Sequence, residues 1–581
     1  MRSLMPLGLA LVLPACNLPV DPFNINPFAP DAGADGPIVR TERPPTAISG
    51  GTLTAQGNTL IVADTDRDRV LGVDLTEREV LFEINDLPEP GRSIFGSDGQ
   101  VHVLLRGSGE VFSFDLDAPE AGTRSPVCGA PRGLVELADG AIWIACAGGT
   151  VHALDPETHT THLVGRPAGD LRDLARVGNR VFVSRLRAAE VLELGAHAEI
   201  LRTIRPQGSN PDQEQAAVAW RLSATGDGRL ALAHQMARTG GPLLTQSYYT
   251  TVPAPCGELV GSALTVFRPD EDRPAVGGVP AFPLPVDFAL DDAGGAAVVS
   301  AGRRGSASAR RMTPQPGHCA DPAAGLPVSE GARSVAVARG IHAYVFQSMD
   351  PPRLDVVPDP PEPGQAAGVR HQPWSLALGG RISADAGHNL FHDATGANIA
   401  CASCHPEGGD DGQVWAFQGA GERRTQYLAG GLAAPFHWTG DLNNFKTFCD
   451  DVLTGRMAGP QLDDASASRF ATWIDSLPAP PLEAPADEAA AERGAEVFAA
   501  AACGVCHRAA GDGQNHDVGT GGPFQTPPLR ALVQRLPLMH DGCAATIADR
   551  FRPECGGAQH GNVAGLSADQ IADLVAYLET L

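Results

Sequence analysis

Two short cysteine motifs in the last third of the chain could carry redox chemistry. They read "CASCH" from Cys401 and "CGVCH" from Cys503. Two thiols three residues apart at the start of a helix can bond both vinyl groups on one edge of a haem, and the histidine that follows can ligate the iron. The motifs therefore predict two covalently bound haem c groups. The residues expected to hold them are Cys401, Cys404, His405, Cys503, Cys506 and His507.

The alternative interpretation of each motif is a redox-active cysteine pair, or half of a zinc site beside a chance histidine. No further CxxC pair lies near either motif to complete a zinc site of the usual kind. A complete motif that occurs twice in one chain is also far rarer by chance than a single one. The repetition favours haem attachment.

The second axial ligand of each iron would decide the chemistry. An iron with two strong ligands transfers electrons, whereas an iron with an open site can bind peroxide or oxygen. Met457 is the candidate ligand for the first haem, and filling a gap in the core is its alternative role. Met539, His560 and His540 are the candidates for the second haem. Further histidines that could serve are His388, His392 and His516.

The N-terminus has the features of an export signal. An apolar run from Leu4 to Leu13, too short to span a bilayer, leads to "LPAC" and Cys16. This sequence resembles a bacterial lipobox, which implies a lipid on Cys16 and a tether to the outer membrane. An ordinary secretory signal is the alternative. Both interpretations place the protein in the bacterial cell envelope, facing the periplasm or the surface. This location fits the cysteine motifs, because c-type haems are attached outside the cytoplasm.

The overall charge narrows the choice of partners. The formal net charge of −25 argues against nucleic acid and anionic membranes, which would repel the chain. Neutral or basic partners are expected, such as a small cytochrome or copper protein that exchanges electrons, or peroxide as a small substrate.

The elements that position the motifs follow from patterns along the chain. Residues 46–360 repeat a plan of short, alternating strands every 35 to 50 residues or so, as in "NTLIVADTDRDRVLGVDL". About seven such units predict a seven-bladed β-propeller, with a pair of β-sandwiches as the alternative. Its histidines are scattered within strands and form no catalytic group, so a docking role is expected for this domain.

The remaining boundaries follow changes in composition. We expect a signal peptide over 1–16, a disordered tether over 17–45 and a linker over 361–374. Helical spacing then predicts a first cytochrome c domain over 375–485 and a second over 486–581. The fold class is thus multidomain, all-β and then α-helical.

Seven cysteines remain beyond Cys16 and the two motifs. In an oxidising compartment they should pair, and proximity suggests three bonds with one thiol left over. The expected pairs are Cys128 with Cys146, Cys256 with Cys319, and Cys543 with Cys555, leaving Cys449.

Two longer segments extend the interpretation. "GHNLFHDATGANIACASCHPEGG" and "FQTPPLRALVQRLPLMHDGCAATI" resemble the haem segments of bacterial di-haem cytochrome c peroxidases and MauG-type proteins. The resemblance covers about residues 375–581. It implies two helical cytochrome c lobes, haems close enough to exchange electrons, and a calcium ion between the lobes. Trp438 matches the tryptophan that lies between the haems in this family.

One departure from the family bears on activity. The family uses Gln and Glu residues to assist peroxide cleavage, and here no glutamate occurs between Arg423 and Leu482. Acid–base catalysis would have to come from His437 or an aspartate. The leading hypothesis is an exported di-haem cytochrome that transfers electrons. A peroxidase or MauG-like oxidase with an open haem is the second hypothesis, and a redox-active propeller is the third.

Overall fold

The computed structural model describes residues 43–239, 259–279, 282–292, 294–302, 308–318, 325–359, 372–417, 419–432, 434–479, 485–508 and 511–581. The predicted signal peptide with Cys16, nearly all of the tether and most of the linker lie outside these residues. The predicted Cys256–Cys319 bond also lies outside them.

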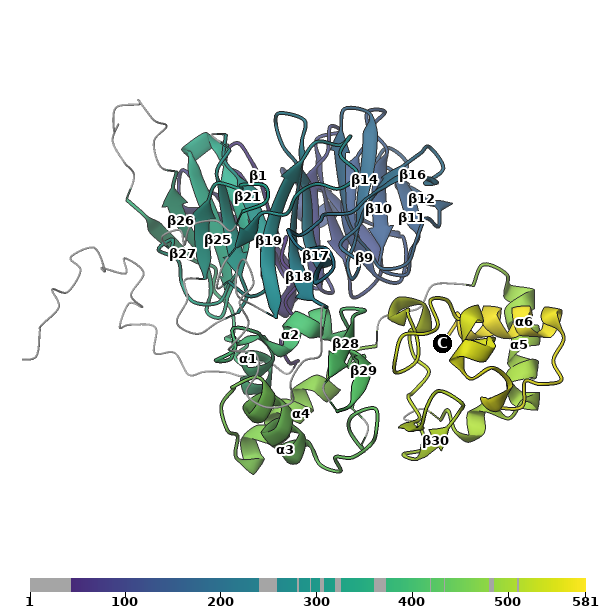
Figure 1. Ribbon diagram of the computed structural model, residues 1–581. Helices are drawn as coiled ribbons and strands as arrows, with labels where there is room; N and C mark the ends of the chain where they lie inside the picture. Colours follow the sequence, from purple (N-terminus) through teal and green to yellow (C-terminus); the bar gives the residue numbers. More distant parts are fainter. Residues whose placement is uncertain are drawn as a thin grey trace, which may run out of the picture.

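Seven antiparallel sheets form the N-terminal domain (Figure 1). The first four are β1 Leu53–Gln56, β2 Thr59–Asp64, β3 Arg69–Asp74 and β4 Glu79–Ile84; β5 Pro90–Phe95, β6 Gln100–Leu105, β7 Glu110–Asp115 and β8 Thr123–Pro126; β9 Pro131–Glu136, β10 Ile142–Cys146, β11 Val151–Asp155 and β12 Thr160–Gly165; β13 Leu171–Val177, β14 Arg180–Arg185, β15 Val191–Leu194 and β16 Ile200–Ile204. The last three are β17 Glu214–Ala224, β18 Leu230–Arg238, β19 Val260–Phe267 and β20 Gly278–Val279; β21 Pro285–Leu290, β22 Ala296–Ser300 and β23 Ala309–Met312; β24 Ala332–Ala338, β25 Ala343–Met349, β26 Pro352–Pro358 and β27 Trp374–Ala377.

The alternation of side chains along each strand explains why the sheets stack face to face. Ile142 and Ile144 of β10 pack towards the second sheet. Trp143 and Ala145, which alternate with these two residues along the strand, pack towards the fourth sheet. Both faces of the strand are therefore buried, as expected of a blade between two others.

The blades close into a ring. The first strands of successive sheets pack against one another in order, and β24 of the last sheet packs against β1 of the first. The predicted seven-bladed β-propeller is confirmed, and the β-sandwich alternative is wrong. The last blade takes its outer strand β27 from beyond the Pro-rich segment, so the propeller extends to Ala377, past the predicted boundary at residue 360.

Two helical lobes follow, which we call the first lobe (residues 378–479) and the second lobe (residues 485–581). The first lobe contains α1 Ala386–His392, α2 Cys401–Cys404, the hairpin β28 Val414–Phe417 and β29 Gly421–Arg424, α3 Phe445–Phe448, a π-helix Cys449–Arg456, and α4 Asp464–Asp475. The second contains α5 Glu488–Ala500, the hairpin β30 Asn515–Asp517 and β31 Pro523–Gln525, and α6 Ala568–Leu578. Among the described residues, no helix has both the length and the apolar character to cross a membrane.

Single turns of 3₁₀ helix connect many of these elements. They are Thr65–Arg67, Pro119–Ala121, Arg339–Ile341, Pro406–Gly408, Cys503–Val505, Leu532–Arg535, Ala548–Phe551, Pro553–Cys555 and Gly557–Gln559.

The first lobe packs against one face of the propeller (Figure 1). Trp220 of the propeller and Trp473 of α4 belong to one hydrophobic cluster. The backbone N–H of Ile48 donates to His392 Nε2 over 3.2 Å, and Gln235 Nε2 donates to the carbonyl of Ser403 over 2.7 Å. Because Ser403 lies within α2, these contacts hold the first cysteine motif directly on the propeller.

Two of the expected disulfides are present, Cys128–Cys146 in the propeller and Cys543–Cys555 in the second lobe. Cys449 is a free, buried thiol, as predicted for the leftover cysteine.

Candidate functional site

The first cysteine motif lines a cavity of about 390 Å³. Cys401 and Cys404 are one helical turn apart on α2, and both line this cavity together with His405. His405 Nδ1 donates to the carbonyl of Gly409 over 3.1 Å. Since a carbonyl can only accept, the proton lies on Nδ1 and leaves the Nε2 lone pair available to a metal ion.

The second motif repeats this arrangement in a cavity of about 330 Å³ that Cys503, Cys506 and His507 line. His507 Nδ1 donates to the carbonyl of Pro527 over 3.1 Å. Burial lowers the pKa of both His405 and His507. Both imidazoles are therefore neutral at pH 7, which is the form that ligates iron. The residues present fit a haem c at each motif.

A second histidine faces His507 across its cavity. His560 Nε2 lies 3.4 Å from His507 Nε2, and the two rings are within 26° of parallel. Both histidines line the cavity of the second motif, so the two imidazoles could together hold one metal ion there. Burial lowers the pKa of His560 to about 3, which keeps it neutral as well.

The other candidates for this position are arranged differently. Met539 lines the cavity. His540 stacks on Phe524 with ring centroids 3.8 Å apart, a structural contact. Of the three candidates from the sequence, His560 is the one with a direct contact to His507 within the described chain.

The first cavity holds two different candidates beside His405. Met457 is buried at the end of the π-helix and lines the cavity. His437 lines it as well, and its Nδ1 lies 3.1 Å from Asp441 Oδ1. His437 Nε2 is buried and has no hydrogen-bond partner among the described residues. The cavity thus contains a thioether that could ligate iron and an imidazole that could transfer a proton.

The remaining sequence candidates do not line the first cavity. His388 and His392 of α1 are buried against Trp473. His516 lines the second cavity, where its Nε2 is 2.7 Å from Asp512 Oδ2.

Trp438 lies in the wall between the two cavities. Its side chain lines both of them, together with Arg424, Gln525, Pro527, Pro528 and Arg535. The indole N–H donates to the carbonyl of Arg424 over 2.7 Å, which fixes the ring in place. The two candidate haem sites are therefore adjacent, as the lobes side by side in Figure 1 also indicate.

Arg424 and Arg535 also lie in this wall and were not predicted from the sequence. Arg424 Nη2 pairs with Asp410 over 2.8 Å, and its backbone N–H donates to the carbonyl of His540 in the other lobe. Both arginines are buried, so they join the lobes at the shared wall. No motif marks them, because the side-chain contact that joins them across the lobes, from Arg424 Nη2 to the carbonyl of Arg535, links residues 111 positions apart.

Glu407, two residues after His405, anchors the first motif to the propeller. Its carboxylate lies 2.5 Å from Arg172, 3.0 Å from Arg132 and 3.9 Å from Arg106. Burial alone would raise the pKa of Glu407, but the three guanidinium groups hold it well below its usual range. This contact between Glu407 and the three arginines was not predicted from the sequence either.

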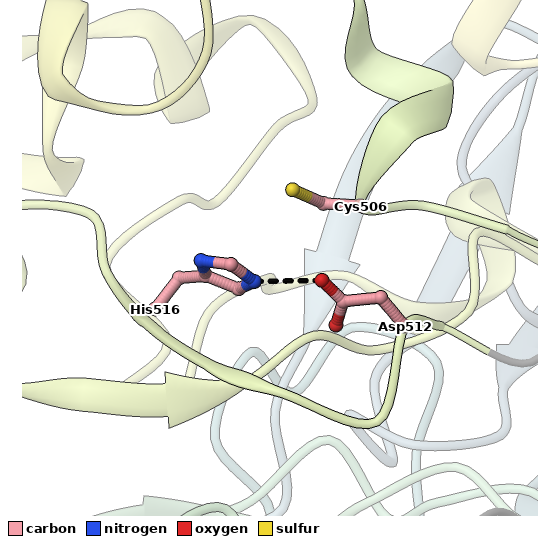
Figure 2. Close-up of side chains that lie close together, drawn as sticks. All are labelled: Cys506, Asp512 and His516. Atoms are coloured by element: carbon pink, nitrogen blue, oxygen red, sulfur yellow. Dashed lines mark hydrogen bonds and ion pairs between the residues drawn. The ribbon is translucent and has the colours of Figure 1, made fainter.

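One further group of possible metal ligands lies at the second motif. Figure 2 shows Cys506 beside Asp512 and His516. The three candidate ligand atoms lie within 4.8 Å of one another. A thiolate would be needed for a metal site here. A thioether bond from Cys506 to haem removes that thiolate and leaves only two ligands, so this group is not a separate metal site once haem is attached.

Residues 491–581 match the family model of cytochrome c. The second lobe is therefore a cytochrome c domain, which implies a covalently bound haem c and haem-based electron transfer. No curated protein sequence matches the chain.

Several solved structures resemble parts of the chain. A hydrazine synthase of Kuenenia stuttgartiensis is 15% identical with a TM-score of 0.43, and the match covers 54% of this chain and 96% of that one. A virginiamycin B lyase of Staphylococcus aureus is 10% identical with a TM-score of 0.36, covering 52% and 92%. Both scores are low, and no functional conclusion follows from these likenesses.

Proposed function

We propose that this protein is an exported di-haem c-type cytochrome that transfers electrons between a haem in each lobe. The observation that carries the proposal is the shared wall, in which one tryptophan lines both cavities. A covalently bound haem iron supplies reversible one-electron chemistry in a fixed place. The protein's part is to hold both groups next to each other.

Each motif residue has a defined role in this proposal. Cys401, Cys404, Cys503 and Cys506 form the thioether bonds. His405 and His507 would ligate iron through Nε2, and their Nδ1 hydrogen bonds to the carbonyls of Gly409 and Pro527 hold the two imidazoles in place. His560 would be the further protein ligand of a haem at the second motif, and Met457 that of a haem at the first.

The second lobe offers the surface for a soluble redox partner. The propeller covers part of the first lobe, whereas Val505, between the two cysteines of the second motif, is 61% exposed. An apolar side chain at the edge of the second haem suits a brief docking contact. The net charge of −25 favours a partner with a basic surface, such as a small cytochrome or copper protein.

Haem content tests this proposal directly. Haem-loaded protein should contain two haem c groups per chain, measured as pyridine haemochrome against protein concentration. A variant that combines Cys401→Ser with Cys404→Ser should retain one. Cys449→Ser is the matched control, since Cys449 lines the same cavity outside the motif, and it should retain two. One haem per wild-type chain would refute the di-haem proposal.

A peroxidase is the second candidate function, and His437 is the observation that favours it. Asp441 orients its imidazole, and its unpartnered Nε2 lies in the wall of the first cavity. Such a pair could accept and return a proton while peroxide is cleaved. This function requires that Met457 does not ligate the first iron. Peroxide-dependent oxidation of a reduced small cytochrome, abolished in His437→Ala, would support it.

We also propose the membrane tether and the calcium ion that the resemblances imply. Cys16→Ser should move the protein from the membrane fraction to the soluble fraction. Elemental analysis of dialysed protein should find one calcium ion per chain. Protein without calcium would refute this proposal.

A further inference from the structure

A third hollow, which we call the arginine cleft, lies between the propeller and the first lobe. Its volume is about 480 Å³, within the range of small-molecule sites. Propeller blades two to four line one side, and the segment after His405 lines the other. Its boundary also includes residues 43–47 and 476–479, Tyr427, Ala429, and Gln534 of the second lobe.

Positive charge exceeds negative charge in this cleft. Five arginines and four carboxylates line it. The carboxylates of Asp170 and Asp410 already have closer partners that do not line the cleft, namely Arg185 over 2.9 Å and Arg424 over 2.8 Å. Burial, together with the Arg106 guanidinium, lowers the pKa of Arg132 to about 10, which reflects this crowding of positive charge.

Two of the arginines that line the cleft have buried N–H groups without a hydrogen-bond partner among the described residues. The side chain of Arg187 is only 8% exposed, and neither its Nε nor its Nη1 has a hydrogen-bond partner in the described part of the chain. Its nearest carboxylate oxygens are 3.6 Å away. Arg106 Nε is also buried and has no hydrogen-bond partner among the residues that the structure describes, and Arg106 Nη2 lies 3.9 Å from Glu407. Buried donors of this kind are costly unless an acceptor meets them.

We propose that the arginine cleft binds a small anion with two or more negatively charged oxygens, a dicarboxylate or an inorganic oxyanion. Guanidinium groups recognise such oxygens through paired, charge-assisted hydrogen bonds. The anion accepts hydrogen bonds from Arg106 and Arg187. It lies behind the first cysteine motif, because Tyr427 lines both the cleft and the first haem cavity. This site does not depend on the proposed electron transfer.

Calorimetric titration of the full-length, haem-loaded protein tests the site. Sodium sulfate and sodium succinate are the probes, in chloride buffer of matched ionic strength. Saturable binding of at least one probe, at one site per chain, is expected, with a higher thermal midpoint in its presence. Binding of sulfate alone identifies an inorganic oxyanion, and binding of succinate alone identifies an organic one. If neither probe binds saturably, the proposal is overturned.

Variants locate the binding. Arg187→Gln and Arg106→Gln should each weaken the affinity about tenfold or more, the loss expected for one charge-assisted hydrogen bond. Arg229→Gln is the matched control, because this exposed propeller arginine pairs with Asp227 and does not line the cleft. Arg106→Gln decides the result if Arg187→Gln does not fold. Wild-type affinity in the folded glutamine variants would place the anion elsewhere and refute the proposal.

Discussion

Glu407 is predicted to be the main electrostatic contact that holds the first lobe on the propeller. Its carboxylate is 8% exposed and faces three arginines. Glu407→Gln keeps the size of the side chain and one acceptor oxygen, but removes the charge. Three guanidinium groups, those of buried Arg172 and of the partly buried Arg132 and Arg106, then lose their shared counter-charge. Removing one partner of a buried ion pair typically costs about 3–5 kcal/mol.

This cost can be measured as a shift in urea unfolding. A slope of about 3 kcal/mol per molar urea converts it into a midpoint lower by about 1–2 M. The transition to follow is the one that exposes the interface, reported by Trp220 and Trp473 fluorescence. Chloride should be the only buffer anion, because a dicarboxylate or oxyanion bound in the arginine cleft would replace part of the lost negative charge and mask the loss of stability. Glu157→Gln, at an exposed propeller turn, is the control. If both variants unfold at the wild-type midpoint, the reasoning about Glu407 is wrong.

Three further predictions concern the haem sites and their surroundings. His560→Ala should remove the second axial ligand of the second haem and produce a high-spin EPR signal; an unchanged low-spin spectrum would exclude His560. Met457→Ala should do the same for the first haem, and no spectral change would rule out that ligand. Burial raises the pKa of Asp411 to about 7, against an ordinary value of about 3.9. Between about pH 4 and pH 7 the folded protein therefore keeps a proton on Asp411 that the unfolded chain releases. The free energy of unfolding should decrease over this pH range, by at most roughly 4 kcal/mol. In Asp411→Asn, the urea midpoint should depend less on pH between pH 4 and 8 than in the wild type. The same pH dependence in both proteins would refute this prediction.

The sequence predicted what depends on local spacing. Alternating side chains such as those of β10 must face opposite neighbours, so the blades could be counted before their arrangement was known. The cysteine motifs likewise place thiols and imidazole within one helical turn. Proximity in the sequence also predicted Cys128–Cys146 and Cys543–Cys555 correctly.

Contacts between distant segments could not be predicted in the same way. Strand β27 joins the last blade only after the Pro-rich segment, which hides it from the repeat pattern. Glu407 and Arg172 are 235 residues apart, and no spacing rule links them. His560 was one of four candidates in its lobe, and only the folded chain shows it opposite His507.

Low-temperature EPR of the oxidised protein, before and after addition of hydrogen peroxide, tests the central claim most directly. Electron transfer through two six-coordinate haems predicts two low-spin signals that peroxide leaves unchanged. A high-spin signal that disappears on addition of peroxide would contradict this account, and His437 would then be the residue to examine as the acid–base group of a peroxidase.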